Sequence, residues 1–406
     1  MMLQFDQIKE HCEKNKILSK KVIDEFIIHY AADKARLVPE MEASIRKYKN
    51  AVRELQQAHI NFLKSEYIAH RVFKKDGLIH KFLNHSAFQG LPKEQMEYLR
   101  FNSENPWRFS FAEVSSNPED SFFKMEDVMT CEDYLLYSPG LQDTLKKHQT
   151  RLWFNLIAFN GQCWQTFGLI IPFTAFSTDD IFFFATELNP KITDEEMLMD
   201  EVEKNPFPFF MLVCGASLPI MASRGHETLH CQSTDSIPGL PTERLKGSFD
   251  VAWNNNVYRF SLKKLAEIPH FAQAYYNEDT RELLRTSMTA YGFKMLTRAL
   301  MKNGIDLPAE ADVSISPAML NTTEKILIRK IQLNPYESYF SLKEEESEDM
   351  KNINAFLSLA LPFYNAGIEF DINELAKKAG IDPVMAADLW KQVKKSTDEL
   401  KNKKDK

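Results

Sequence analysis

Apolar residues in the first hundred positions recur at the three- and four-residue spacing of an amphipathic helix. The apolar positions between Val22 and Tyr30 follow this spacing, and Ser19 precedes them as a candidate N-cap. Pro39 suits the first turn of a second helix, where its missing N–H has no intrahelical partner to lose. The pattern therefore predicts a helical N-terminal region over residues 1–100.

Within this region, the apolar positions from Met41 to Phe73 step by four and three residues. This spacing predicts one long amphipathic helix, although His59 and Glu66 interrupt its apolar seam. Two interpretations follow: a coiled-coil arm that would make a homodimer, or a helix that lies on its own domain. The small number of clean heptads favours the second.

The pattern changes to strict alternation at Trp107, which predicts a β-strand, and residues 122–129 are a second candidate. Asn160-Gly161 separates two apolar runs and predicts a type I′ hairpin, because both residue types accept positive φ. Both faces of this hairpin are apolar, so we expect it to lie in a sheet covered on each side. The predicted register places Phe159 opposite Gln162, Ile157 opposite Trp164 and Phe154 opposite Phe167.

Farther along, residues 180–187 and 207–214 are apolar enough to predict two more strands. The capping box at 193–196 predicts a short helix that ends near residue 205. A second hairpin is predicted from residues 249–253 and 257–262, which flank three asparagines. Two later helices are predicted over residues 281–303, ended by Gly304, and over 323–333.

These elements predict an α+β protein in three parts, since 406 residues exceed what one ordinary core holds. The first part is the helical N-terminal region, residues 1–100. The second is an α+β core domain over 101–342, with a central mainly antiparallel sheet flanked by helices. The third is a small helical domain over 343–406, which begins at the charged run 343–349.

Composition narrows the classes of function. A net charge of −7 and a pI near 5.9 argue against a broad nonspecific nucleic-acid surface. The N-terminus has acidic residues and no apolar signal sequence, and no apolar run reaches the roughly 18 residues of a membrane span. The 5 cysteines are scattered without a CxxC pair, which is typical of thiols in a reducing compartment. We therefore expect a cytoplasmic protein with no membrane contact.

The sharpest chemical motif is HETLH at residues 226–230, an HExxH pattern. On a helix, His226 and His230 would ligate zinc and Glu227 would act as the base of a zinc-dependent hydrolase. However, Gly225 weakens a helix, and the segment also alternates like a strand. In a strand the two histidines lie about 13 Å apart and cannot share one metal ion. Zinc therefore stays an alternative, and no cofactor is expected otherwise.

Residues 373–396 have the layout of a helix-turn-helix, with Gly380 at the turn and Asp382 and Pro383 at the start of the second helix. A DNA reader presents the first turn of that helix to the base edges. Here this turn carries Val384 and Met385 beside acidic residues, which suits a protein partner better than DNA. A DNA-binding regulator is thus an alternative.

The remaining carboxylates carry no catalytic signature. Asp179-Asp180 is predicted as a polar turn between strands, and Glu113, Asp127 and Glu187 as residues on or near strands. Neither GxxxxGK[ST] nor GxGxxG occurs, so phosphate-binding loops of those types are absent. The leading expectation is a non-catalytic binding or scaffold protein that acts through protein–protein contacts, with self-association as one form of such contact.

Overall fold

The computed structural model describes residues 5–146, 150–340, 348–365 and 368–404. The chain is 50% helical and 21% strand, with helices at both ends and antiparallel sheets between them, which confirms the α+β class. It divides into two compact units, residues 1–216 with 325–328 and residues 217–324 with 329–406. This division differs from the boundaries expected at 100 and 342. Most of the charged run 343–349 lies outside the described residues.

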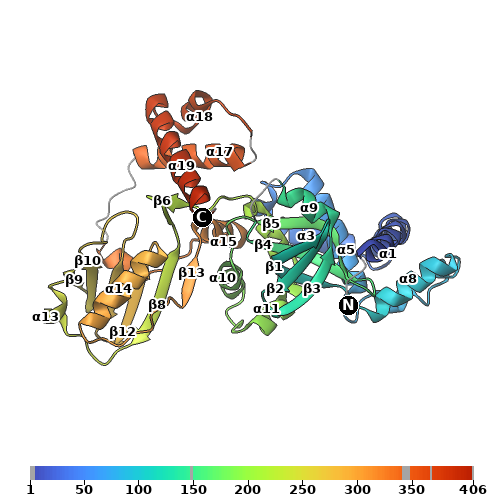
Figure 1. The fold of residues 1–406 in the computed structure, drawn as a ribbon, viewed down its shortest axis with the longest axis horizontal. Helices are drawn as coiled ribbons and strands as arrows, with labels where there is room; N and C mark the ends of the chain where they lie inside the picture. Colours follow the sequence, from blue (N-terminus) through green and yellow to red (C-terminus); the bar gives the residue numbers. More distant parts are fainter. Residues whose placement is uncertain (1–4, 147–149, 341–347, 366–367, 405–406) are drawn as a thin grey trace. The chain divides into compact units, whose positions relative to one another are not determined.

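A closed barrel forms the centre of the first unit (Figure 1). Strands β1, β2 and β3 are consecutive and antiparallel, and β4 returns beside β1, which is a Greek-key arrangement. Strand β5 closes the barrel by pairing antiparallel with β4 and parallel with β3. The strands are β1 (Arg108–Glu119), β2 (Phe122–Asp127), β3 (Glu132–Tyr137), β4 (Leu152–Phe159) and β5 (Trp164–Phe173).

The β4–β5 hairpin was predicted correctly, but its register was wrong. The loop has four residues, so Phe159 pairs with Trp164 and Ile157 pairs with Thr166. The side chain of Asn160 accepts the N–H groups of residues 162 and 163 and thereby widens the turn. Between Phe154 and residue 156 the register shifts again at a bulge on β5.

Both faces of β4 are buried, as its apolar pattern predicted. One face packs inside the barrel, where Trp153 and Ile157 meet residues of β1, β2 and β3 and Leu141 of the helix α9 (Pro139–Leu145). On the other face, Phe154 stacks on Phe109 and Phe111 with ring centroids 5.2 and 4.4 Å apart. Helices cover this outer face, so the barrel wall has two packed sides.

Helices surround the barrel in the first unit (Figure 1). Those before it are α1 (Phe5–Ser19), η1 (Lys20–Ile27), α2 (Ile28–Lys34), α3 (Leu37–Lys47), α4 (Lys49–Val52), α5 (Gln57–Phe73), α6 (Ile79–Phe82), α7 (Ser86–Gln89) and α8 (Lys93–Glu104). Those within and after it are α9 (Pro139–Leu145), α10 (Thr178–Leu188), α11 (Glu195–Lys204), α12 (Phe207–Met211) and η2 (Leu212–Gly215).

Two expectations for the N-terminal helices were wrong. Ser19 has helical φ and ψ and makes no side-chain cap, because the chain continues as a helix through it. The long helix expected from Met41 to Phe73 is broken into α3, α4 and α5, with a break at residues 53–56. The breaks let Met41, Tyr48 and Phe73 all become buried in one unit. The continuous seam needed by a coiled-coil arm is therefore absent from the described helices of this region.

Two segments predicted as strands are helices. Residues 180–187 lie in α10, which starts with a capping box: Ser177 accepts the N–H of Asp180, and the Asp180 carboxylate accepts the N–H of Ser177. Asp179-Asp180 is thus the first turn of a helix rather than a turn between strands. Residues 207–214 form α12 and η2, which are buried almost throughout. The helix expected after residue 193 is present as α11, capped by Asp194.

The second unit contains a six-stranded antiparallel sheet in the order β13-β8-β12-β11-β10-β9. Helix α14 packs on one face through Leu296 and Leu300, and Tyr336 and Phe340 pack on the other. Its elements are β6 (Ala222–Ser223), β7 (His226–Glu227), β8 (His230–Ser236), α13 (Thr242–Leu245), β9 (Phe249–Asn254), β10 (Val257–Leu262), β11 (Gln273–Asn277), β12 (Glu282–Ser287), α14 (Ala290–Lys302), β13 (Val313–Ile315), α16 (Glu337–Phe340) and the part of α15 (Pro317–Leu327) that precedes residue 325.

The β9–β10 hairpin was predicted, but its loop has two residues, Asn255 and Asn256, both with positive φ. The helix predicted over 281–303 was too long, because its first part is strand β12. Thr289 caps α14 instead, by accepting the N–H of Gly292. The helix predicted over 323–333 begins earlier, at Pro317.

The described residues of the last part of the chain are helical, as expected, and form α17 (Glu348–Asn365), α18 (Ile372–Ala379) and α19 (Pro383–Lys404). Trp390 lies at its centre and packs against Phe356, Tyr364 and Phe370. Gly380 takes a left-handed conformation at the turn, with φ of 72°. The predicted helix-turn-helix layout is therefore present.

Candidate functional site

A cavity of about 700 Å³ lies in the first unit, between its N-terminal helices and the β4–β5 side of the barrel. The walls come from α1, η1 and α2, from α5 and α8, from the β4–β5 hairpin and from the start of α9. Binding sites for small molecules typically enclose roughly 300–1,000 Å³. The cavity therefore has the volume of a small-molecule site.

The helical wall contains a π-helical segment. The helices α1, η1 and α2 follow one another without a break, and the N–H of Ile28 bonds to the carbonyl of Ile23, five residues back. Lys16, Lys20 and Asp24 all line the cavity from this wall. In an α-helix, side chains four residues apart differ by about 40° in their direction around the helix axis, and the wider turn of the π-helical segment compensates for this difference. The segment thus keeps a stripe of side chains on the cavity, and such segments occur frequently at functional sites.

Aromatic side chains form much of the opposite surface. Trp107 is buried, while Phe101, Phe159 and Phe167 are half-buried beside the cavity. Phe62 of α5 is 52% exposed and also lines it. Aromatic groups left partly uncovered by protein offer apolar surface that a ligand can bury.

Polar groups in the walls are bonded mainly to one another. The indole N–H of Trp107 donates to the Asn102 amide oxygen at 2.6 Å, and Asn160 donates to Gln165 at 2.9 Å. The hydroxyl of Tyr137 donates to Glu13 at 2.6 Å. These bonds hold the walls in place.

Charges in the lining balance. Lys16 lies 3.5 Å from Glu13, three residues away on α1. Lys20 and Asp24 are four residues apart on η1, and the lysine counteracts the effect of burial and of Glu25 on the aspartate pKa, which is raised overall. A ligand in this cavity therefore meets charges of both signs rather than an excess of one sign.

A buried carboxyl group lies directly behind one wall. Glu66 of α5 is 1% exposed and faces Gly168, a cavity residue of the β5 bulge with φ of +79°. Neither carboxylate oxygen makes a hydrogen bond of normal geometry. Burial raises the pKa of Glu66 to about 8, although the backbone N–H groups of Leu169 and Leu156 partly counteract this. The group is thus mainly protonated at neutral pH.

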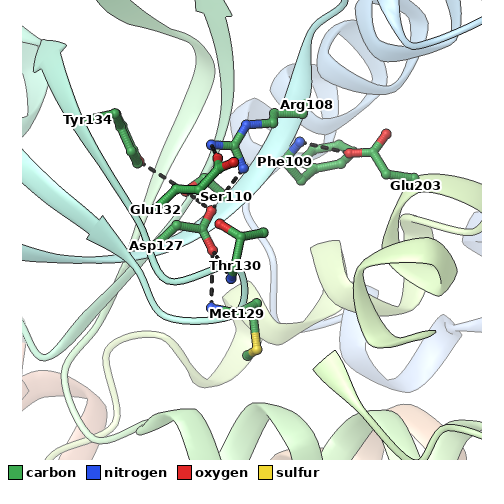
Figure 2. A network of polar contacts seen from close by, with 9 residues as sticks. All are labelled: Arg108, Phe109, Ser110, Asp127, Met129, Thr130, Glu132, Tyr134 and Glu203. Carbon is green, nitrogen blue, oxygen red and sulfur yellow. Dashed lines mark hydrogen bonds and ion pairs between the residues drawn. The ribbon is translucent and has the colours of Figure 1, made fainter. Parts of the chain in front are cut away.

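A second polar cluster lies at one end of the barrel, where β1 begins, β2 ends and β3 begins (Figure 2). Arg108 is 3.2 Å from Asp127 and 2.9 Å from Glu132. The hydroxyl of Ser110 donates to Asp127 at 2.7 Å and lies 2.9 Å from the Tyr134 hydroxyl. The other oxygen of Asp127 accepts the N–H groups of residues 129 and 130, so this carboxylate ties the β2–β3 turn to β1.

On the other side of β1, Glu203 of α11 accepts the N–H of Phe109 at 2.9 Å (Figure 2). The other oxygen of Glu203 lies 2.5 Å from His70 of α5. His70 is fully buried, and its pKa is lowered mainly by burial, with Glu203 acting in the opposite direction. No substrate can reach a histidine in this position. The first cluster therefore joins strands within the barrel, and the contacts of Glu203 hold α5 and α11 to it.

The HETLH segment lies in strands, not in a helix. His226 and Glu227 form β7, and His230 begins β8. The ring of His226 contacts the rings of His270 and Tyr291, with centroids 4.8 and 5.4 Å apart. Across the described parts of the chain, no group of three or more His, Cys, Asp or Glu side chains could hold a metal ion. The helical spacing that a zinc site at His226 and His230 requires is thus missing.

The other carboxylates considered from the sequence do not meet one another at a site. Glu113 is exposed on β1, whereas Asp127 is buried in the cluster at the barrel end. Glu187 lies on α10 rather than on a strand. The first turn of α19 exposes Val384 and Met385, by 71% and 48%, next to Asp382.

Comparison with known proteins adds no relative: no family model matches, and neither a curated protein nor a solved structure is similar to this chain. Among the helices that the structure describes, none is both long enough and apolar enough to cross a membrane.

The cavity residues were not identified from the sequence. They come from positions 13 to 170, and their aromatics were assigned to the core because apolar runs look alike in both settings. One signal was present: Lys16, Lys20 and Asp24 interrupt one stripe of a helix at four-residue spacing. A polar stripe of this kind is as typical of a cavity wall as of a solvent-exposed helix face.

Proposed function

We propose that this protein is a non-catalytic binding protein and that the cavity of its first unit binds a small, uncharged, largely apolar molecule. The observation that supports this most is the partly uncovered aromatic surface of Phe101, Phe159 and Phe167 within about 700 Å³. Burying apolar area of this kind contributes roughly 25 cal/mol per Å².

The balance of charges supports the choice of an uncharged ligand. Glu13 pairs with Lys16, and Lys20 and Asp24 add one charge of each sign to the lining, so neither an anion nor a cation meets an excess of opposite charge. The polar side chains bond to one another, which suits a preformed wall rather than a group that transfers protons.

The exposed face of β2 and β3 argues against a nucleic acid as the ligand of this barrel. Five-stranded Greek-key barrels of the OB type bind oligonucleotides on the strand 2–3 face. Here the exposed side chains of those strands are Lys124, Glu126, Glu132 and Asp133. Three acids beside one lysine repel a phosphate backbone.

The proposal is tested with N-phenyl-1-naphthylamine, an uncharged dye that fluoresces in apolar surroundings. We expect saturable binding at one site of the full chain. The substitution Ala158→Phe, which places a ring on the cavity wall, should weaken binding at least tenfold. Ser116→Phe, on the exposed end of β1, is the matched control and should leave it unchanged.

The anionic dye 8-anilinonaphthalene-1-sulfonate separates the two parts of the proposal. It should bind more weakly than the uncharged dye at the same site. Stronger binding of the anion would contradict the uncharged ligand class. Equal dye binding by wild type and Ala158→Phe would contradict the cavity as the site. Urea denaturation of each variant shows that it is folded.

A second candidate function is contact with a protein partner through α17–α19. The exposed Val384 and Met385 beside Asp382 and Asp388 suit a basic, amphipathic segment of a partner. Labelled melittin, a peptide of that kind, should bind the full chain, and Val384→Ser with Met385→Ser should abolish binding. Labelled duplex DNA titrated in parallel should show no salt-dependent binding. Salt-dependent binding would instead support a DNA-binding role for α17–α19.

A further inference from the structure

Two cysteines from distant parts of the chain meet at the edge of the cavity. Cys12 lies on α1, and Cys163 ends the loop between β4 and β5. Their sulfur atoms are 3.4 Å apart. Both side chains are buried, with exposures of 0% and 2%. A disulfide bond needs a separation of about 2.0 Å, so a movement of about 1.4 Å would join them.

The surroundings of the pair favour a nucleophilic sulfur at Cys163. The Cys12 thiol hydrogen-bonds to Cys163 and lowers the pKa of Cys163, and the amide of Asn160 lowers it further, against the opposing effect of burial. The Asn160 amide nitrogen lies 3.2 Å from the Cys12 sulfur and 3.6 Å from that of Cys163. The backbone N–H of Tyr137 also supports the thiolate of Cys163. A thiolate is the form of cysteine that reacts with oxidants.

We propose that Cys12 and Cys163 are a site of reversible oxidation, at which hydrogen peroxide converts the two thiols into a disulfide. The Cys163 thiolate attacks one peroxide oxygen, the O–O bond breaks, and the leaving hydroxide takes a proton to become water. The sulfenic acid formed at Cys163 is then attacked by the Cys12 sulfur. The S–S bond forms and a second water leaves, so two thiols and one peroxide give one disulfide and two waters.

The position of the pair explains the choice of oxidant. Glu13 and Asn160, which adjoin the pair, line the cavity, so the sulfur atoms lie just behind a wall that solvent reaches. Peroxide has the size to pass such a wall, whereas a bulky disulfide does not. Cys131 is exposed and therefore reacts with either oxidant.

Oxidation would have a mechanical consequence. The disulfide would join positions 151 residues apart and fix α1, which forms part of the cavity wall, to the β4–β5 loop. Closing so long a loop restricts the unfolded chain strongly. The proposal does not depend on what the cavity binds, because it rests on the two sulfur atoms and their neighbours.

The test uses the full chain with Cys131→Ser, which removes the exposed thiol. After hydrogen peroxide treatment, we expect an intact mass lower by about two hydrogen atoms and a cross-linked peptide that contains both Cys12 and Cys163. Dithiothreitol should reverse both changes. The midpoint of thermal unfolding should rise on the order of 10 °C on oxidation.

Two variants complete the test. In Cys12→Ser, peroxide should leave a sulfenic acid on Cys163, which dimedone traps when urea unfolds the protein after oxidation, and the rise in midpoint should be lost. In Cys163→Ser, dimedone should label position 12 at least tenfold more slowly. Failure to recover the cross-linked peptide from folded, oxidised protein would overturn the proposal, as would equal labelling of the two variants.

Discussion

Replacement of Glu66 by glutamine should change how the stability of the protein depends on pH. The folded-state pKa is raised from 4.5 to about 8 by burial, so folding must protonate this carboxyl at neutral pH. The contribution of the Glu66 carboxyl to the free energy of unfolding is therefore fully present below pH 4.5 and is lost as pH rises through 8. Each pH unit between those limits removes about 1.4 kcal/mol, and the whole interval removes about 5 kcal/mol.

Glutamine is uncharged at every pH and nearly the same size as glutamate, so Glu66→Gln removes only the pH-dependent contribution of this carboxyl. Urea denaturation of both proteins at pH 5, 6, 7 and 8 gives the difference in unfolding free energy. We expect this difference to move in favour of the variant by roughly 3.5 kcal/mol between pH 5 and 8. Other titrating groups cancel in the difference, and Glu97→Gln on the exposed side of α8 controls for the loss of one acidic residue. A constant difference across this range would refute the idea of a neutral buried carboxyl.

Two further predictions use matched pairs of substitutions and urea denaturation. Asp127→Ala should lower the free energy of unfolding by roughly 3–5 kcal/mol, because it leaves Arg108 and two backbone N–H groups without their buried acceptor. The side chain of Glu132 is 65% exposed, so Glu132→Ala should lower it by less than about 1 kcal/mol. Equal losses in the two variants would contradict the structural role of Asp127. Gly168→Ala should lower the free energy of unfolding by roughly 1–3 kcal/mol, since φ is +79° and the added carbon would lie 3.1–3.2 Å from the Glu66 side chain. Gly90→Ala adds its carbon in open space and should be nearly neutral. A neutral Gly168→Ala would show that the bulge relaxes freely.

Local patterns were enough to predict the class of fold and several turns. The alternation from Trp107, the hairpin around Asn160-Gly161 and the αL glycine at Gly380 each follow from the chemistry of a few adjacent residues. The helix at 178–188 could also have been predicted, because Ser177 and Asp180 have capping-box spacing. It was missed because its three consecutive phenylalanines suit a buried strand equally well.

Features that depend on distant contacts could not be predicted in this way. Glu66 was visible as a polar residue in an apolar seam, but nothing in its neighbours indicates that Gly168 lies against it. The register of the β4–β5 hairpin depends on how the Asn160 side chain bonds inside its loop. The closed barrel requires the pairing of β3 with β5, which sequence spacing does not encode. The cavity exists only once these pairings are made.

The division of the chain has a consequence for synthesis on the ribosome. Residues 325–328 belong to the first unit, although the rest of that unit ends at residue 216. In this piece Ile326 is buried, and Lys325 pairs with Glu54 at 3.0 Å. The emerging N-terminal unit therefore stays incomplete while more than a hundred further residues are translated, and a gene cut after codon 216 encodes it without this last piece.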